Sequence, residues 1–342
     1  MKDIKSIKSI LDEFRERNVP FITVNNSEWY SLFRDEIRNS IAIEGIFANR
    51  SELLSVLERG QQRTTDQKSA AILGYFEAAS TLYEYAENQY ETNEFQLRLS
   101  DLKQIHTLLM RYEDQLGTFT GRLGGFRIED VAVTQSKFTP LNYNYLHHTL
   151  PVFVQWHNVN IHEPKFDPLT FIAASHVLFE TVHPFRDGNG RVGRILLSYL
   201  LIGSGLINIS IKGTAKADRD KYYHALEVGD NEVEKMLRRI EQGENPTVSR
   251  INRVIQQSKL GPVKTIILQR LNHSLDLVEK DIKTMDRDAL IPLRDAARFY
   301  SYSPDYLRQL IHLRKLPALK RGKLWYVKVR DIEQYSKSVQ RE

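Results

Sequence analysis

The sequence contains no cysteine among its 342 residues, and this absence excludes several kinds of chemistry. Without a thiol there is no disulfide, no thiolate nucleophile and no cysteine-ligated zinc. A long hydrophobic segment is also lacking, because the longest apolar stretch, 195–209, is interrupted by Ser198, Gly203 and Ser204. It falls short of the ~20 residues that a membrane span needs and predicts a buried core helix. The charged N-terminus does not resemble a secretory signal, so we expect a cytoplasmic protein with no membrane partner.

The composition that remains is that of an ordinary globular protein, with 41% hydrophobic and 27% charged residues. The net charge of +5 is unevenly placed. Residues 287–342 hold thirteen Lys and Arg against six Asp and Glu, a balance of +7, which leaves 35 basic and 37 acidic residues, or −2, for the rest. This asymmetry predicts a separate basic tail with its own partner.

Apolar residues at three- and four-residue spacing predict a mainly helical chain. The predicted helices cover 29–45, 49–59, 66–88, 99–112, 145–158, 168–182, 190–205, 218–228 and 230–241. The glycine-rich stretch 117–140 interrupts them and predicts a β-hairpin or an extended loop. Residues 242–248 form a predicted linker, and an apolar stripe over 263–282 predicts a long helix used for packing or dimerisation.

The strongest chemical signal lies in residues 183–194, which read His-Pro-Phe-Arg-Asp-Gly-Asn-Gly-Arg-Val-Gly-Arg. The segment connects two predicted core helices and leads into the N-terminus of the second. Gly188 and Gly190 permit a sharp turn and a close backbone approach, and a helix N-terminus attracts anions. Arg191 and Arg194 follow three residues apart near one face. Together these features predict a site that handles phosphate groups.

Two further residues of the segment bring reactive groups to this site. Asp187 is a hard oxygen ligand suited to Mg²⁺ on a polyphosphate. His183 is the one group that exchanges a proton near neutral pH. Taken alone, a His-Pro dipeptide and a Gly-Asn-Gly turn are ordinary structural features, and only their combination in twelve residues points to chemistry.

The segment matches every defined position of the Fic-domain signature, His-Pro-Phe-x-Asp/Glu-Gly-Asn-Gly-Arg-x-x-Arg. The resemblance extends over roughly residues 20–245. Residues 125–133 resemble the flap of the family, and 222–226 resemble the helix that closes its nucleotide pocket. The resemblance implies a mainly α fold, in which an all-helical core carries a short β-hairpin flap. It also implies an activity, the transfer of AMP from ATP to a Tyr, Ser or Thr hydroxyl of a protein, the chain itself included.

The resemblance assigns a role to each matching residue at the reacting end of the nucleotide. His183 is the implied general base, and Asp187 the implied Mg²⁺ ligand. Asn189 is implied to hydrogen-bond the α-phosphate, assisted by the backbone N–H groups of Gly188 and Gly190.

Other matching residues are implied to hold the rest of the nucleotide. Arg191 and Arg194 would bind the β- and γ-phosphates. Val133 of the flap would line the pocket, and Tyr222 and Tyr223 would flank the adenine.

Two positions refine the implied activity. Gly190 stands where relatives that act as kinases carry lysine, which favours nucleotidyl transfer. Asp230 stands where the family often has asparagine near the end of the pocket helix, and this departure leaves the base preference open.

A second motif lies at residues 40–45, where Ser40 and Glu44 are four residues apart and share a helix face. Gly45 is a suitable C-cap, so the stretch taken alone is simply a helix end. Beside the signature it resembles the inhibitory motif of the family, whose glutamate pairs with the second arginine, here Arg194. The same Glu44 could instead position a water that removes AMP from a modified protein.

The basic tail resembles the small winged helix-turn-helix domains of excisionase and MerR-type proteins. Ser303 and Pro304 predict the start of its second helix, and a hairpin follows. The residues implied to contact DNA are Arg308, Arg314, Lys320, Arg321 and Lys323. A basic protein-docking domain is the alternative.

The expected organisation has four parts: an N-terminal helical region (1–65) with the inhibitory motif, a Fic core (66–245), connecting helices (246–286) and the winged helix-turn-helix (287–342). The resemblance also implies a homodimer. The alternatives to AMP transfer are de-AMPylation, transfer of another nucleotide or phosphate-linked group, and a DNA-binding regulator whose core senses nucleotides.

Overall fold

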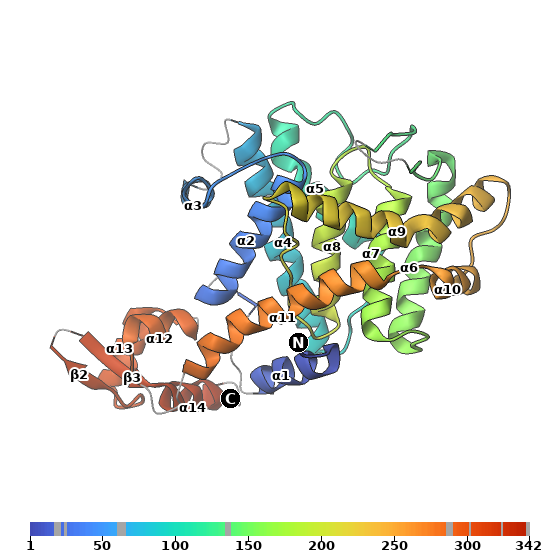
Figure 1. Ribbon diagram of the computed structural model, residues 1–342. Helices are drawn as coiled ribbons and strands as arrows, with labels where there is room; N and C mark the ends of the chain where they lie inside the picture. Colours follow the sequence, from blue (N-terminus) through green and yellow to red (C-terminus); the bar gives the residue numbers. More distant parts are fainter. Residues whose placement is uncertain are drawn as a thin grey trace.

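The computed structural model describes residues 1–16, 22–23, 26–59, 66–133, 138–284, 290–300, 302–322 and 324–339. Most of them are helical, and Figure 1 shows a large helical body with a small lobe at the C-terminal end. The N-terminal half contains α1 (Ile4–Glu16), α2 (Ser27–Ile43), α3 (Arg50–Arg59), α4 (Gln67–Glu91), α5 (Leu99–Gln115), the 3-10 helix η2 (Tyr143–Tyr145) and α6 (Leu146–His162). The remainder contains α7 (Pro168–Val182), α8 (Asn189–Gly203), α9 (Lys216–Glu241), α10 (Val248–Gln257), α11 (Gly261–Thr284), β1 (Leu290–Pro292), α12 (Leu293–Phe299), α13 (Pro304–His312), β2 (Leu319–Arg321), β3 (Leu324–Lys328) and α14 (Val329–Val339).

Helix α8 is the centre of the large body (Figure 1). All its residues except Gly190 are buried, and α4, α5 and α7 pack against it. The apolar stretch 195–209 thus supplies the predicted core helix. No helix among the described residues is long and apolar enough to cross a membrane.

The predicted helices are confirmed to within a few residues at most boundaries, with one clear exception. The sequence predicted two helices, 218–228 and 230–241, but α9 is a single helix that continues through Gly229. A Cβ atom at this glycine would lie 3.2 Å from Val177 of α7. The close approach of α7 to α9 thus explains the glycine, which does not mark a helix end.

Helix α2 is attached to the body by a buried carboxyl group, that of Glu36. It accepts hydrogen bonds from Tyr75, Tyr83, Ser198 and Asn208, which belong to α4, α8 and the segment after α8. Burial raises its pKa to about 7. Four donors from other elements fix the position of α2 and therefore of the residues at its C-terminal end.

The flap contains no strand among its described residues, so the predicted β-hairpin is wrong for them and the extended loop is correct. The turn region 134–137 lies outside the described residues. The backbone N–H of Arg127 donates to the carbonyl of Pro184 at 2.9 Å. This hydrogen bond joins the flap to the loop between α7 and α8.

The small lobe has a hydrophobic core of its own, to which α12, α13, β3 and α14 contribute. Its three strands form an antiparallel sheet in the order β1-β3-β2, with Ile291 opposite Val327. Strand β1 was not predicted. The predicted start of α13 is confirmed, because the Ser303 hydroxyl accepts from the N–H of Tyr306 at 3.0 Å and Pro304 follows. Strands β2 and β3 form the predicted hairpin.

Candidate functional site

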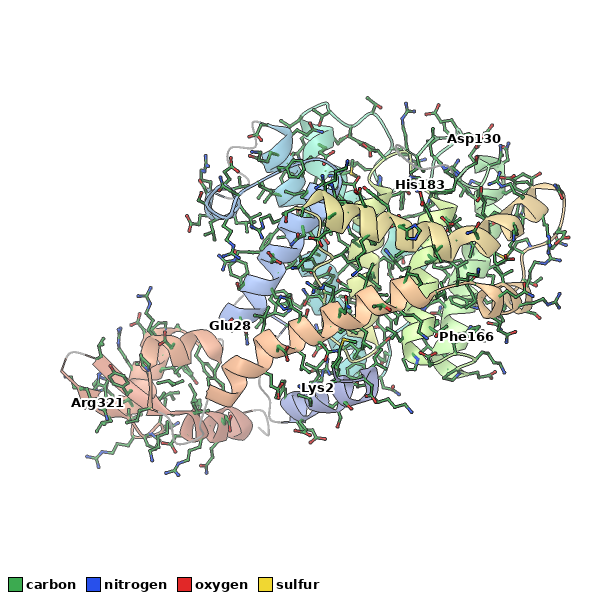
Figure 2. All side chains as sticks on the ribbon, viewed as in Figure 1. Lys2, Glu28, Asp130, Phe166, His183 and Arg321 are labelled. Atoms are coloured by element: carbon green, nitrogen blue, oxygen red, sulfur yellow. The ribbon has the colours of Figure 1, made fainter. Side chains whose placement is uncertain are left out.

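A cavity of about 640 Å³ opens between the C-terminal end of α2, the flap, the loop between α7 and α8, and α9. The residues of the two sequence motifs that line it are His183, Asp187, Gly188, Asn189, Gly190, Arg194, Glu44 and Gly45. Val133, Tyr222 and Tyr223 line it as well. Figure 2 shows His183 within the large body and Arg321 far away in the small lobe.

His183 occupies the end of α7 in a left-handed conformation, with φ of 53°. Its Nδ1 lies 3.2 Å from the carbonyl oxygen of Glu180. Because a carbonyl only accepts, Nδ1 carries the proton and Nε2 is the basic nitrogen. Burial lowers the pKa of His183 to about 4. The imidazole is therefore neutral at physiological pH and ready to accept a proton.

The turn into α8 is held by its own polar side chains. Gly188 has φ of +77°, and its N–H donates to the Asp187 carboxylate at 2.6 Å. The Asn189 amide closes the loop, since it accepts from the N–H of Phe185 and donates to the carbonyl of Phe185, both at 2.8 Å. Asn189 thus lines the cavity while both ends of its amide are engaged with the loop.

The structure separates the two arginines that the sequence placed near one face. Arg194 lines the cavity, whereas Arg191 is outside its lining and forms a buried ion pair with Glu113 of α5. Because the two residues are three positions apart on α8, the side chain of Arg191 points toward α5 and that of Arg194 toward α2. No sequence signal pointed to Glu113, because it lies 78 positions before its partner.

Removing Glu113 is expected to destabilise the protein strongly. Glu113→Ala leaves the Arg191 guanidinium buried without a counter-ion, which costs about 3–5 kcal/mol. Urea unfolding of the full chain measures the change. Glu232→Ala is the matched control, since its pair with Lys235 is at the surface and its loss should shift the midpoint little. Equal shifts in the two variants would refute the assignment.

Glu44 lies against Arg194 at the mouth of the cavity, with 2.6 Å between Oε1 and Nη2. Arg194 also donates from Nε to the Ser40 hydroxyl at 2.8 Å and from Nη2 to the Ser40 carbonyl at 3.1 Å. Partial burial alone would raise the pKa of Glu44, but the charge and hydrogen bond of Arg194 outweigh it and lower the pKa. Glu44 is therefore a carboxylate.

Two glycines make this contact possible. Gly45, with φ of +81°, ends α2 in a Schellman arrangement, in which Gly45 N–H donates to Ala42 and Ile46 N–H to Ile41. On the other side, a Cβ atom at Gly190 would lie 2.6 Å from Glu44 Oε1. The carboxylate thus fits because α8 has no side chain there.

The wall of the cavity formed by α9 is aromatic near one end and acidic near the other. Tyr222 is buried, with its hydroxyl 2.8 Å from His176 Nε2, and Tyr223 donates to the carbonyl of Ile43 at 3.1 Å. Asp230 lies two turns further along α9. Burial, with Glu234 and Glu227 nearby, raises its pKa to about 7.

Sequence reasoning missed two residues that hold the loop, Arg127 and His106. The Arg127 guanidinium donates to the backbone carbonyls of His183, Glu129 and Leu141. The His106 ring stacks on Phe185 with 4.1 Å between centroids, accepts from the N–H of Gly124 and contacts the carbonyl of Asp187. The one available signal was an arginine between two apolar residues of the flap, Phe126 and Ile128.

The implied DNA contacts of the tail are exposed residues of the small lobe, apart from Lys323, which is outside the described residues. Arg308 pairs with Asp305 on α13, and Arg314 follows that helix with φ of 57°. Lys320 and Arg321 lie over the rings of Trp325 and Tyr326.

Comparison with known proteins identifies the class. Residues 96–201, a range that contains the loop 183–194, match the model of the Fic/DOC family. Residues 96–201 therefore form a Fic/DOC-family domain.

Two curated relatives are named protein adenylyltransferases. One, from Aquifex aeolicus and named a probable one, is 27% identical over 88% of this chain and 86% of its own length. The other, from Caenorhabditis elegans, is 24% identical over 67% of this chain and 43% of its own. The chain thus spans most of the first relative but under half of the second.

Solved structures agree on the fold. A Fic-domain-containing signalling protein from Bacteroides thetaiotaomicron has a TM-score of 0.56 at 17% identity, over 81% of this chain and 95% of its own. Fic-1 from Caenorhabditis elegans has a TM-score of 0.55 at 19% identity, over 82% of this chain and 73% of its own.

Proposed function

We propose that the chain is an enzyme, a protein adenylyltransferase that transfers AMP from ATP to a Tyr, Ser or Thr hydroxyl and is held inactive by Glu44. The observation that carries the proposal is one cavity that contains a neutral histidine, a helix N-terminus and an arginine engaged by a carboxylate. The named relatives support the reaction class.

In the proposed reaction the target hydroxyl attacks the α-phosphorus of ATP. A bond forms between that hydroxyl oxygen and phosphorus, the bond to the bridging oxygen breaks, and pyrophosphate leaves. The hydroxyl proton passes to Nε2 of His183, which is unprotonated because burial lowers its pKa to about 4. The hydrogen bond to the Glu180 carbonyl keeps the ring in the required tautomer.

The start of α8 would hold the phosphates. The backbone N–H group of Gly190 and the helix dipole favour anions there, while the N–H of Gly188 donates to Asp187. Asp187 fits Mg²⁺, because this ion is commonly bound by one or two carboxylates together with substrate phosphates. Bound Mg²⁺ would neutralise charge that develops on the phosphates. Arg194 would add a guanidinium once Glu44 releases it.

Inhibition would follow from the same contact. While Glu44 engages Arg194, the guanidinium is unavailable to the γ-phosphate, and the carboxylate repels that phosphate. The nucleotide would then bind in a pose unsuited to in-line attack.

The position of the label in ATP identifies the transferred group. The Glu44→Gly protein should transfer label from α-³²P ATP to protein and none from γ-³²P ATP. Mass spectrometry should find an AMP adduct on a hydroxyl side chain. Transfer of γ-label would mean a kinase and would overturn the proposal.

The acid limb of the pH profile tests the state of the base. Since His183 must be neutral, kcat/KM of the Glu44→Gly protein should stay level as pH falls to about 6 and decline only near the low pKa of about 4. Initial rates with α-labelled ATP at each pH provide the profile. The same measurement with a slow alternative substrate corrects the profile for the protonation of ATP itself. A decline of kcat/KM centred at a pH of about 6.5, the ordinary pKa of histidine, would contradict the buried environment of His183.

For the tail we propose DNA binding as a second function. The supporting observation is a group of exposed cations, Arg314, Lys320 and Arg321, on and before the β2–β3 hairpin. An exposed cationic wing suits contact with phosphates.

Salt dependence tests this function. The double variant Lys320→Ala, Arg321→Ala should bind mixed-sequence duplexes more weakly, and the slope of log K against log salt should become shallower by about 2. Fluorescence anisotropy gives the slope. Lys235→Ala, an exposed position on α9, should leave it unchanged. Absence of duplex binding by the unmodified chain at low salt would refute the function.

A further inference from the structure

Glu180 is a carboxyl group in the cavity that the proposed transfer step leaves unused. It lies on α7 one turn before His183 and lines the same cavity as Glu44 and Arg194. Within the described part of the chain, its Oε1 is buried and accepts no hydrogen bond. A buried carboxyl oxygen without a partner is unusual and calls for a state in which it has one.

Helix α8 makes room for this carboxyl as it does for Glu44. A Cβ atom at Gly193 would lie 2.1 Å from Oε1 of Glu180, and a Cβ atom at Gly190 would lie 2.6 Å from Oε1 of Glu44. Two glutamates, one from α7 and one from α2, thus approach α8 where it lacks side chains. Arg194 directly follows Gly193 and lies one turn after Gly190 on the same helix.

Burial keeps Glu180 neutral in this state. Burial raises its pKa to about 8; the positive charge of Arg194 opposes this effect, and the negative charge of Glu44 adds to it. The ionisable groups that interact electrostatically with it are Arg194 on α8, Glu44 on α2, and Tyr222 and Tyr223 on α9. His176 on α7 and His183 at the end of that helix have a lowered pKa because of burial and are neutral.

We propose that Glu180 is a second carboxyl partner of Arg194, neutral while Glu44 or a nucleotide triphosphate engages the guanidinium and ionised when neither does. This inference rests on the proposed function, since it takes the triphosphate to replace Glu44. A buried guanidinium without a counter-ion is costly, and ionised Glu180 supplies one. An arriving triphosphate brings new negative charge, which favours the protonated acid.

One consequence is that triphosphate binding takes up a proton. In the enzyme whose Glu44 no longer engages Arg194, the Glu180 carboxylate accepts a proton from the buffer as the nucleotide binds. No other covalent bond changes. Glu180 therefore acts as a positioning residue, which holds Arg194 in place while the cavity is empty. Its replacement should affect nucleotide affinity and its pH dependence more than the chemical step.

Calorimetry counts this proton. The α,β-methylene analogue of ATP with Mg²⁺ is titrated into full-length Glu44→Gly protein at pH 7.5, in two buffers of different ionisation enthalpy. We expect an uptake of about 0.5–1 proton per nucleotide, which the added Glu180→Gln change should remove. The nucleotide, His183 and Asp230 exchange protons in the Glu44→Gly protein and in the Glu44→Gly, Glu180→Gln protein alike. Their contributions therefore cancel when the two uptakes are compared. Glu232→Gln, a carboxyl on α9 outside the cavity lining, is the matched control and should retain the uptake.

The affinity of the same analogue gives a second readout. In the Glu44→Gly protein the affinity for the analogue should weaken as the pH rises from 7 to 9. The loss should reach about tenfold for each unit by which the bound nucleotide raises the pKa of Glu180. In Glu44→Gly, Glu180→Gln this additional decline should be absent. Binding with identical proton uptake in both proteins would overturn the role of Glu180 and leave the proposed function standing. No binding by either protein would overturn both.

Discussion

Replacing Glu44 with glycine is expected to raise AMP transfer by about thirtyfold or more. Glu44 contributes a charge-assisted hydrogen bond to Arg194 at 2.6 Å, and such a bond is worth about 2 kcal/mol. Since about 1.4 kcal/mol corresponds to a factor of ten, releasing it shifts Arg194 strongly toward the phosphates. The rate of labelling of target and of the chain itself from α-labelled ATP measures the effect.

Two companion variants show whether the charge is responsible. Glu44→Gln keeps a hydrogen-bonding group of the same shape but no charge, so its gain should be smaller than that of Glu44→Gly. Ser40→Ala removes the hydroxyl that accepts from Arg194 Nε but leaves the carboxylate, and it should activate least. Activation in the reverse order would mean that Ser40, and not the carboxylate, holds Arg194.

Replacing His183 with alanine in the Glu44→Gly background should lower transfer by about 10²–10⁴-fold, the range lost with a general base. Nε2 is the basic nitrogen at the loop, because Nδ1 is fixed on the Glu180 carbonyl. ATP binding should change little, since the imidazole takes part in proton transfer and not in phosphate binding. Initial rates and the affinity for the α,β-methylene analogue separate the two effects.

The control for this prediction is His148→Ala, an exposed histidine on α6 outside the cavity lining. It should retain full activity. Thermal unfolding should show the same midpoint for His148→Ala and His183→Ala to within a few degrees. Residual transfer by His183→Ala close to that of Glu44→Gly alone would refute the role of the histidine.

The sequence was most informative where function depends on a short segment. Gly188 and Gly190 indicated a turn into a helix, and α8 begins there. Periodic apolar residues predicted most helices because each helix buries one face. The i, i+4 spacing of Ser40 and Glu44 placed both on the side of α2 that meets Arg194.

Contacts between distant segments could not be predicted in this way. Arg191 looked like a phosphate ligand until the structure placed Glu113 beside it. Arg127 holds the loop through backbone carbonyls, which have no sequence signature. The flap was expected to form a β-hairpin or an extended loop, and the choice between them depends on contacts with distant segments such as the bond from Arg127 N–H to the Pro184 carbonyl. In each case packing between elements decided the outcome.

The anchoring of α2 bears on how inhibition would be relieved. Glu36 accepts from four side chains of the body, and Trp29 donates to Asn208 at 2.8 Å, so the helix is firmly attached. Glu44 lies beyond these contacts, at the C-cap next to Gly45. Release would therefore involve Glu44 and the last turn, whose own contacts are those of Ser40 with Arg194 and of Ile43 with Tyr223.

Labelling with α-³²P ATP tests the central claim most directly, with unmodified protein, Glu44→Gly, and Glu44→Gly with His183→Ala compared side by side in cell lysate. We expect weak labelling by the first, strong labelling by the second, and background labelling by the third. Equal labelling by the unmodified and Glu44→Gly proteins would contradict the inhibitory pair. Undiminished labelling by the double variant would contradict the catalytic site itself.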